Sequence, residues 1–170
     1  MKIRAYLDIE TSFLGDITVV GIFVAPDNFI QLVGGNIEEN TIITALDNAD
    51  VIVTFNGSRF DLPVIKRKTG LDLRKNFKSH DLMYDCWKNN LHGGLKAVEM
   101  KLGISRETEG LSGRDALFLW DRYVKRGDNA ALDLLLKYNK EDVMNLLVLE
   151  DRLFGHRPKG KQLVSKGDRP

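Results

Sequence analysis

The sequence predicts a three-layer α/β domain in which a mixed, roughly five-stranded sheet is flanked by helices. Short β-type segments fill the N-terminal third, whereas apolar residues after Asp61 recur mostly at helical spacing. A continuous apolar run at 51–55 is typical of a strand that is covered on both faces. Strands followed by flanking helices favour this fold class over an all-helical or all-β domain.

The strands are predicted first, in chain order. Turn residues and alternating apolar positions place them at 3–10, 17–24, 28–33 and 51–55. A turn at 26–28 separates the second and third strands, and a short amphipathic segment at 38–48 precedes the fourth.

Helical signals follow Asp61. The segments LPVIKRK and DLMYDCW are short and amphipathic, and in GLKAVEMKLG the residues Leu95, Val98 and Leu102 repeat at helical spacing before Gly103 ends the run. Residues 114–126 and 130–153 are predicted to form two further helices.

Composition limits the class of protein. The 170 residues, 43% of them hydrophobic, fit one globular domain, which we expect at 1–154, followed by a basic, flexible tail at 155–170. The single cysteine, Cys86, excludes an internal disulfide framework. No apolar run approaches the ~20 residues of a membrane span. We therefore expect no membrane association and a cytoplasmic location.

Net charge does not indicate a nucleic-acid-binding protein, because 25 Lys and Arg residues almost cancel 24 Asp and Glu residues. Two local basic clusters, residues 66–78 and the tail, depart from this balance. Either could contact phosphate groups. The alternative is a solvated helix end and loop for the first cluster and a disordered terminus for the second.

Two acids, Asp8 and Glu10, lie in the first predicted strand. Side chains alternate along a strand, so both acids point away from the face that carries Leu7 and Ile9. Carboxylates roughly 7 Å apart repel each other unless a cation lies between them. The alternative explanation is a sheet face that is open to solvent.

Two more acids follow later in the chain. Asp61 comes after the 51–55 strand, where a helix N-cap is the simpler explanation. Tyr138 and Asp142 are four residues apart and share a face of any continuous helix. As alternatives, Asn139 could cap a helix and Tyr138 could be a core aromatic. Convergence of the four acids would require divalent cations such as Mg²⁺ or Mn²⁺.

Three motifs occur in order along the chain, namely DIE at 8–10, NGSRFD at 56–61 and YNKED at 138–142. Their order and spacing resemble those of the DEDD 3′–5′ exonucleases, which have a ribonuclease H-like fold. Tyr138 resembles the tyrosine of the DEDDy branch, since the DEDDh branch would have a histidine in place of Lys137. The segments 95–104 and 113–123 are similar to helices of the YprB-type predicted exonucleases, so the resemblance covers roughly residues 3–153.

This resemblance implies a two-metal-ion site for Mg²⁺ or Mn²⁺. Asp8 would bridge both cations, Glu10 and Asp142 would complete the first, and Asp61 would hold the second. Tyr138 would position the attacking water. Further residues are expected to contact the substrate, namely Thr11, Asn56, Phe60, Lys66 and Lys96.

The implied reaction is hydrolysis of the terminal phosphodiester bond at the 3′ end of single-stranded nucleic acid, with release of nucleoside 5′-monophosphates. DNA is slightly preferred as the substrate, and a larger replication or repair assembly is an expected partner. An RNA exonuclease and a non-catalytic nucleic-acid-binding module are the alternatives. Other polar residues receive no catalytic role: Asp81 as a helix cap, Asp115 and Asp121 as surface acids, and His80, His92 and His156 for want of metal-ligand spacing.

Overall fold

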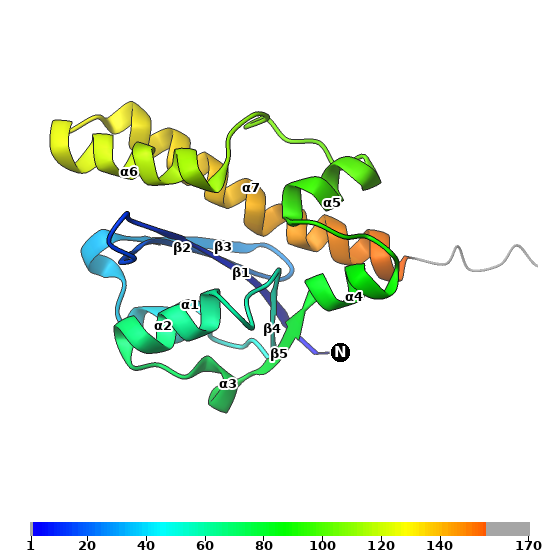
Figure 1. The fold of residues 1–170 in the computed structure, drawn as a ribbon. Coiled ribbons are helices and arrows are strands. Elements are labelled where there is room, and N and C mark those ends of the chain that lie inside the picture. The colour runs from blue at the N-terminus through cyan, green and yellow to red at the C-terminus, as the bar shows by residue number, and fades with distance from the viewer. Residues whose placement is uncertain (1, 156–170) are drawn as a thin grey trace, which may run out of the picture.

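A mixed sheet forms the middle layer of the computed structural model, which describes residues 2–155 (Figure 1). Its five strands lie in the order β3-β2-β1-β4-β5. They are β1 (Arg4–Thr11), β2 (Ile17–Val24), β3 (Asn28–Val33), β4 (Val51–Thr54) and β5 (Lys78–Asp81). Strands β1 to β3 pair antiparallel, whereas β4 pairs parallel with both β1 and β5. The predicted fold class is confirmed.

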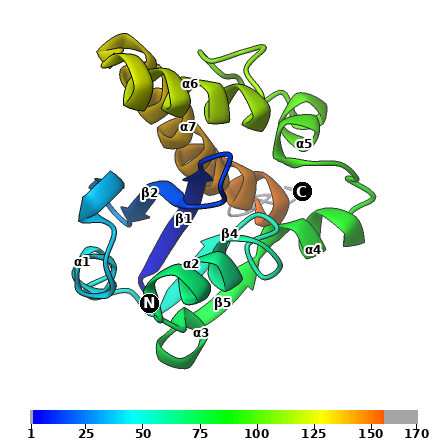
Figure 2. The same cartoon turned by 60° about the vertical axis from the view of Figure 1, so that its left-hand side comes forward.

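Helices cover both faces of the sheet (Figures 1 and 2). They are α1 (Glu39–Ala45), α2 (Asp61–Thr69), α3 (Leu73–Asn76), α4 (Leu82–Lys88), α5 (Leu95–Leu102), α6 (Gly113–Arg126) and α7 (Asn129–Phe154), with a 3₁₀ turn at Gly34–Asn36. Residues of α1, α2 and α3 pack in one core, and residues of α4, α5 and α7 pack in another on the opposite face.

The fifth strand was not located from the sequence. Its residues Lys78, Ser79 and His80 are polar, and only Asp81 is buried. A four-residue strand at the edge of the sheet needs no alternating apolar pattern, because one side of it faces solvent. Strand β5 therefore forms by pairing with β4, and no local sequence pattern predicts this strand.

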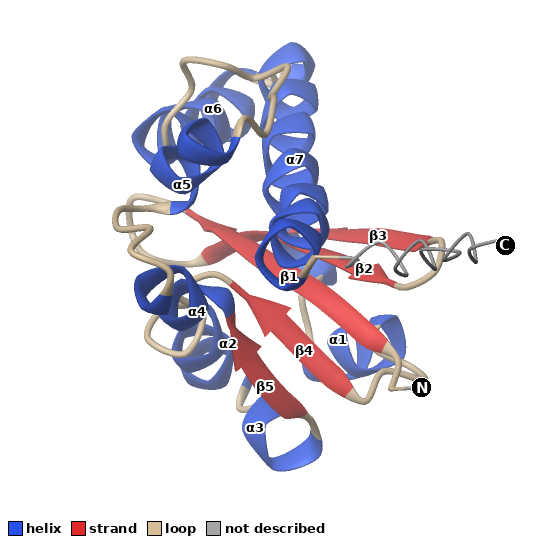
Figure 3. Cartoon of the chain, turned by 90° about the vertical axis from the view of Figure 1, so that its right-hand side faces the viewer, coloured by secondary structure: helices blue, strands red, loops and turns tan. Residues whose placement is uncertain are grey.

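Strand β1 separates an apolar face from an acidic face, as its alternation predicts. Leu7 and Ile9 belong to the core beneath α1 and α2. Glu10, on the other face, is only 7% exposed. The explanation of a solvent-facing sheet is therefore wrong, because helices cover the acidic side of β1 (Figure 3).

Close approach of α7 to the sheet depends on Gly21. Gly21 is the β2 partner of Asp8. A Cβ atom at this position would lie 2.2 Å from Asn139 Oδ1 and 2.8 Å from a methyl group of Val143. Glycine thus lets the middle of α7 lie directly over β1 and β2, which brings the C-terminal motif to the N-terminal acids.

Gly21→Ala is expected to destabilise the protein by about 1–3 kcal/mol, because the new methyl group overpacks the interface between β2 and α7. Urea denaturation of both proteins measures this change. Gly35→Ala is the matched control, since a Cβ there meets no atom within 4 Å. Equal stability of Gly21→Ala and the parent would show that α7 can shift without cost.

The expected tail falls largely outside the described residues. The predicted domain boundary at residue 154 therefore stays a prediction, as does any role of the tail, and His156 lies outside the described part as well. Within residues 2–155, no helix combines the length and the apolar character that crossing a bilayer requires.

Candidate metal centre

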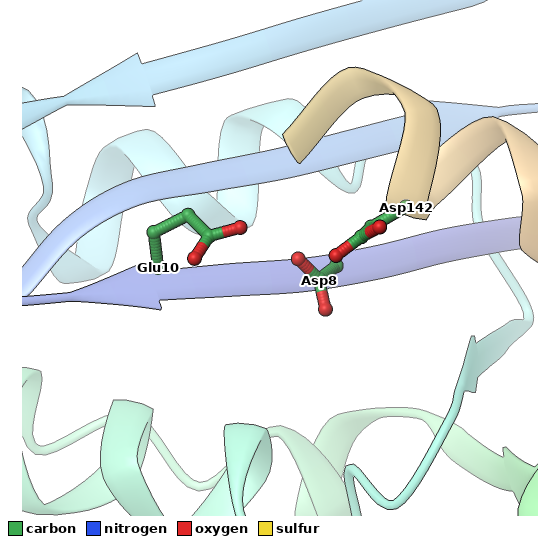
Figure 4. A group of neighbouring side chains, drawn as sticks. All are labelled: Asp8, Glu10 and Asp142. Carbon is green, nitrogen blue, oxygen red and sulfur yellow. The ribbon is translucent and has the colours of Figure 1, made fainter. Parts of the chain in front are cut away.

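Three carboxylates meet above the C-terminal half of β1 (Figure 4). Asp8 and Glu10 project from β1, and Asp142 projects from α7. Each offers an oxygen atom, and these atoms all lie within 4.8 Å of one another. The group borders a cavity of about 210 Å³ that is also lined by Ile9, Thr11, Phe60, Gly113, Leu117 and Tyr138.

Asp61 approaches the same strand from the opposite layer. Strand β1 extends beyond β4, so the backbone N–H of Ile9 has no partner in β4. The Asp61 carboxylate accepts a hydrogen bond from this N–H at 3.1 Å. The helix-cap explanation is wrong, because Phe60 occupies the N-cap position of α2 and Asp61 is its first residue. Asp61 is thereby held beside the backbone between Asp8 and Glu10.

Burial and mutual repulsion control the protonation of this site. Burial, followed by the charges of Asp142, Glu10 and Asp61, raises the pKa of Asp8 well above its ordinary value. Burial and Asp142 do the same to the pKa of Glu10. Burial raises the pKa of Asp61 to about 7. The cluster therefore resists full ionisation unless positive charge enters it.

These residues fit a divalent cation. The Glu10 carboxylate, although buried, accepts no hydrogen bond from any residue in the described part of the chain. Carboxylate oxygens are the ligands that Mg²⁺ and Mn²⁺ prefer. Asp8, Glu10 and Asp142 could bind such an ion, and its positive charge would remove the repulsion among them.

Without a divalent cation, the protein is expected to lose stability as pH rises from about 5 to 8. The folded-state pKa of Asp61, about 7, exceeds its ordinary value of 3.8. The folded state thus binds more protons than the unfolded state in this interval, so the free energy of unfolding falls, by about 3 kcal/mol between pH 5 and pH 8 for Asp61 alone. Thermal denaturation in EDTA measures this trend, and Mn²⁺ should flatten it.

Asp61→Asn is the control for this pH dependence. His80 contributes a slope of the same sign, because its hydrogen bond with Glu150 raises the pKa of His80. The difference between the parent and Asp61→Asn removes that contribution. Identical pH profiles for the two proteins in EDTA would contradict the assignment of the slope to Asp61.

Tyr138 lies one helical turn before Asp142 and is 2% exposed. The ammonium nitrogen of Lys96 contacts the Tyr138 hydroxyl and lies 4.1 Å from the centre of its ring. Burial raises the pKa of Tyr138, and Asp142 and Glu10 raise it further. The phenol consequently stays protonated at neutral pH and can form hydrogen bonds at the edge of the cavity.

Asn139 is part of the site, which sequence reasoning missed. It is buried inside α7 rather than at a helix end, so the explanation of Asn139 as a cap is wrong. Its Nδ2 donates to Asp8 Oδ2 at 3.0 Å, and Gln31 Nε2 donates to its Oδ1 at 2.9 Å. This chain of hydrogen bonds sets the orientation of the Asp8 carboxylate.

Arg106 was also missed. Its guanidinium contacts Asp142, and its Nη1 donates to the two Glu99 oxygens at 2.9 Å and 2.8 Å. Asn145 Nδ2 donates to Glu99 Oε1 at 2.9 Å. Glu99 is 1% exposed and shares an inward stripe of α5 with Leu95. That acid on an apolar stripe was the available sequence signal for a buried ion pair.

Comparison with known proteins identifies the superfamily and the fold. The family profile of the RNase H superfamily matches residues 5–154. The chain belongs to the RNase H superfamily. No curated protein matches it significantly. The family B DNA polymerase from the hyperthermophilic archaeon Pyrobaculum calidifontis has a similar structure, with a TM-score of 0.69 and 17% identity over 91% of this chain and 25% of the polymerase chain.

The similarity to the polymerase shows the fold alone, because the identity is low. This RNase H superfamily chain spans about a quarter of the polymerase. The chemistry of this chain therefore depends on its own residues, above all on the acidic face of β1.

The RNase H superfamily fold brings some of the expected substrate-contacting residues to the cavity. Thr11 and Phe60 line it, and Lys96 lies beside Tyr138. Asn56 lies in the turn after β4, where its backbone N–H donates to Asp81 at 2.7 Å. Lys66 lies in the last turn of α2, remote from the start of that helix, and pairs with Asp72 at 2.8 Å. The structure does not bring Lys66 to the carboxylate group of Asp8, Glu10 and Asp142.

The three acids to which the sequence analysis gave no catalytic role cap helices or form surface ion pairs. Asp81 caps α4 by accepting from the backbone N–H of Met83 at 3.2 Å, which confirms that expectation. Asp115 forms a capping box with Ser112 at the start of α6. Asp121 pairs with Lys125 one turn later at 2.8 Å. None of the three belongs to the carboxylate group formed by Asp8, Glu10 and Asp142.

Proposed function

We propose that this RNase H superfamily domain is a metal-dependent 3′–5′ exonuclease of the DEDDy, YprB-like type that acts on single-stranded nucleic acid. The observation that carries the proposal is the convergence of Asp8, Glu10 and Asp142 with Tyr138 one turn away. We propose DNA as the slightly preferred substrate, with RNA as the alternative.

Four carboxylates would hold the cations. Asp8, Glu10 and Asp142 would bind the first divalent ion, and Asp61, anchored on the Ile9 N–H, would bind the second. Mg²⁺ or Mn²⁺ supplies Lewis-acid stabilisation of the phosphoryl charge when bound. Asn139 keeps the Asp8 carboxylate turned toward this position through its Nδ2 donor.

Tyr138 orients the attacking water through its hydroxyl. The water oxygen forms a bond to the terminal phosphorus, and the bond from phosphorus to the 3′ oxygen of the preceding nucleotide breaks. The attacking water gives up one proton to solvent, and the 3′ oxygen takes one up from solvent to become the new 3′ hydroxyl, while the terminal nucleotide leaves as a 5′-monophosphate. Lys96, which lies beside Tyr138, would contact the scissile phosphate, and Phe60 and Thr11, which line the cavity, would contact the terminal nucleotide.

A gel assay tests this function. Purified protein is incubated with 5′-labelled single-stranded DNA or with RNA of the same sequence, in Mg²⁺, Mn²⁺ or EDTA. We expect a ladder shortened from the 3′ end with either cation and intact substrate in EDTA, with faster shortening of DNA. Faster shortening of RNA would favour the RNA exonuclease. Binding without any shortening would favour the non-catalytic module.

A further inference from the structure

An exposed aromatic surface lies outside the candidate metal centre. We call it the Arg59–Tyr84–Trp87 surface. The rings of Tyr84 and Trp87 meet edge to face with their centres 5.5 Å apart. The guanidinium carbon of Arg59 lies 5.6 Å from the centre of the Trp87 ring and 5.9 Å from that of Tyr84. Trp87 is 37% exposed, so its ring remains accessible from solvent.

The turn that carries Arg59 is joined tightly to α4. The Asp81 carboxylate accepts from the backbone N–H of Asn56 at 2.7 Å, from that of Ser58 at 3.0 Å and from Ser58 Oγ at 2.6 Å. A Cβ on Gly57 would lie 2.3 Å from Thr54 Oγ1, so the turn also packs closely against the end of β4. The positions of Arg59, Tyr84 and Trp87 relative to one another are thus fixed before any ligand binds.

Anchoring of α4 does not account for the exposed Trp87 ring, whereas Tyr84 is half-buried beside it. Its buried face is made by Leu82, Met83 and Cys86. Arg59 is exposed and has no ion-pair partner among residues 2–155. A guanidinium without an acidic partner, placed beside the exposed Trp87 ring, is complementary to a phosphate backbone whose bases stack on that ring.

The surface adjoins the candidate metal centre. Arg59 is followed in sequence by Phe60, which lines the cavity and is 44% exposed, and then by Asp61. Figure 3 shows α4 and the start of α2 at the edge of the sheet where β1 and β4 end. A strand whose 3′ end enters the cavity can therefore pass over Phe60 to reach Trp87.

We propose that the Arg59–Tyr84–Trp87 surface binds nucleobases of single-stranded nucleic acid upstream of the 3′-terminal nucleotide. This inference rests on the proposed function, because that function places the 3′ end at Asp61. Every base offers a flat π face, so binding here is tolerant of sequence. The surface selects strands that are long enough to extend from the cavity to α4.

Tryptophan fluorescence tests the contact directly. The chain has two tryptophans, Trp87 and Trp120, so Trp120→Phe leaves Trp87 as the only one. This protein, with Asp8→Asn added to prevent cleavage, is titrated with a thymidine 12-mer and with a thymidine dinucleotide. We expect the 12-mer to quench Trp87 and the dinucleotide to leave its emission nearly unchanged.

Affinity measurements identify the residues. In the Asp8→Asn chain, Trp87→Ala should weaken binding of the 12-mer about 5- to 150-fold, the range for one base–aromatic contact. Arg59→Ala should also weaken it and lower the slope of log affinity against log salt by about 0.7. Trp120→Phe is the matched control, because Trp120 packs beside Tyr123 on α6.

The outcomes separate this inference from the proposed function. Absence of quenching by the 12-mer, or unchanged affinity in both Trp87→Ala and Arg59→Ala, would overturn the surface. Cleavage of the dinucleotide by the unaltered chain is measured separately. Quenching with no cleavage of any substrate would support the surface and reject the exonuclease, whereas cleavage without quenching would do the opposite.

Discussion

Asp142→Asn is expected to lower single-turnover cleavage of a 3′ end by about 10³-fold or more and to weaken Mn²⁺ binding. A neutral amide replaces a charged oxygen ligand, and the lost stabilisation of phosphoryl charge amounts to several kcal/mol. The fold should survive, because an asparagine oxygen can still accept from Arg106 and one source of repulsion with Asp8 and Glu10 is removed. Isothermal titration calorimetry with Mn²⁺ and single-turnover kinetics measure the two effects.

Asp121→Asn is the matched control for this change, since Asp121 is an acid of helix α6 that pairs with Lys125. It should retain parental Mn²⁺ affinity and cleavage. Retention of parental cleavage by Asp142→Asn would exclude Asp142 as a ligand and would require another arrangement of the metal centre.

Tyr138→Phe should slow single-turnover cleavage by roughly 10²-fold while Mn²⁺ affinity and thermal stability stay near parental values. The ring keeps its packing, and only the hydroxyl that we propose orients the attacking water is lost. The variant therefore separates a positioning role from metal binding, which Asp142→Asn cannot do. Single-turnover rates at saturating Mn²⁺, beside a calorimetric titration, measure this separation.

Tyr123→Phe makes the same chemical change on α6, where Tyr123 packs beside Trp120, and should have no effect on cleavage. Near-parental turnover in Tyr138→Phe would identify Tyr138 as a packing residue. Loss of Mn²⁺ affinity in Tyr138→Phe would show instead that the hydroxyl supports the ligands.

Positive side chains lie beside the acids of the candidate metal centre. Lys96 and Arg106 act to lower the pKa of Asp142, although burial raises it overall. Arg106 is itself held by Glu99, so this cation cannot move away without leaving a buried carboxylate unpaired. The protein thus restrains Asp142 with a fixed guanidinium, while Asp8 is oriented by the neutral amide of Asn139.

Two features of the site could be predicted from the sequence alone, namely the acidic face of β1 and the position of Tyr138 and Asp142 on one helix face. Both follow from local backbone periods, two residues for a strand and 3.6 for a helix, which no distant contact needs to supply. The mixed α/β class followed from the same periods. Order and spacing of the three short motifs then indicated the superfamily before any distance was known.

The contacts that hold these acids depend on the three-dimensional fold and could not be predicted. Strand β5 forms because it pairs with β4. Asp61 accepts a hydrogen bond from the Ile9 N–H because β1 extends beyond the end of β4. Arg106 reaches Asp142 across 36 positions of the chain, and Asn139 reaches Asp8 across 131. Local propensity carries no information about such pairs, because their energy arises when burial removes water from charged groups that the sequence keeps far apart.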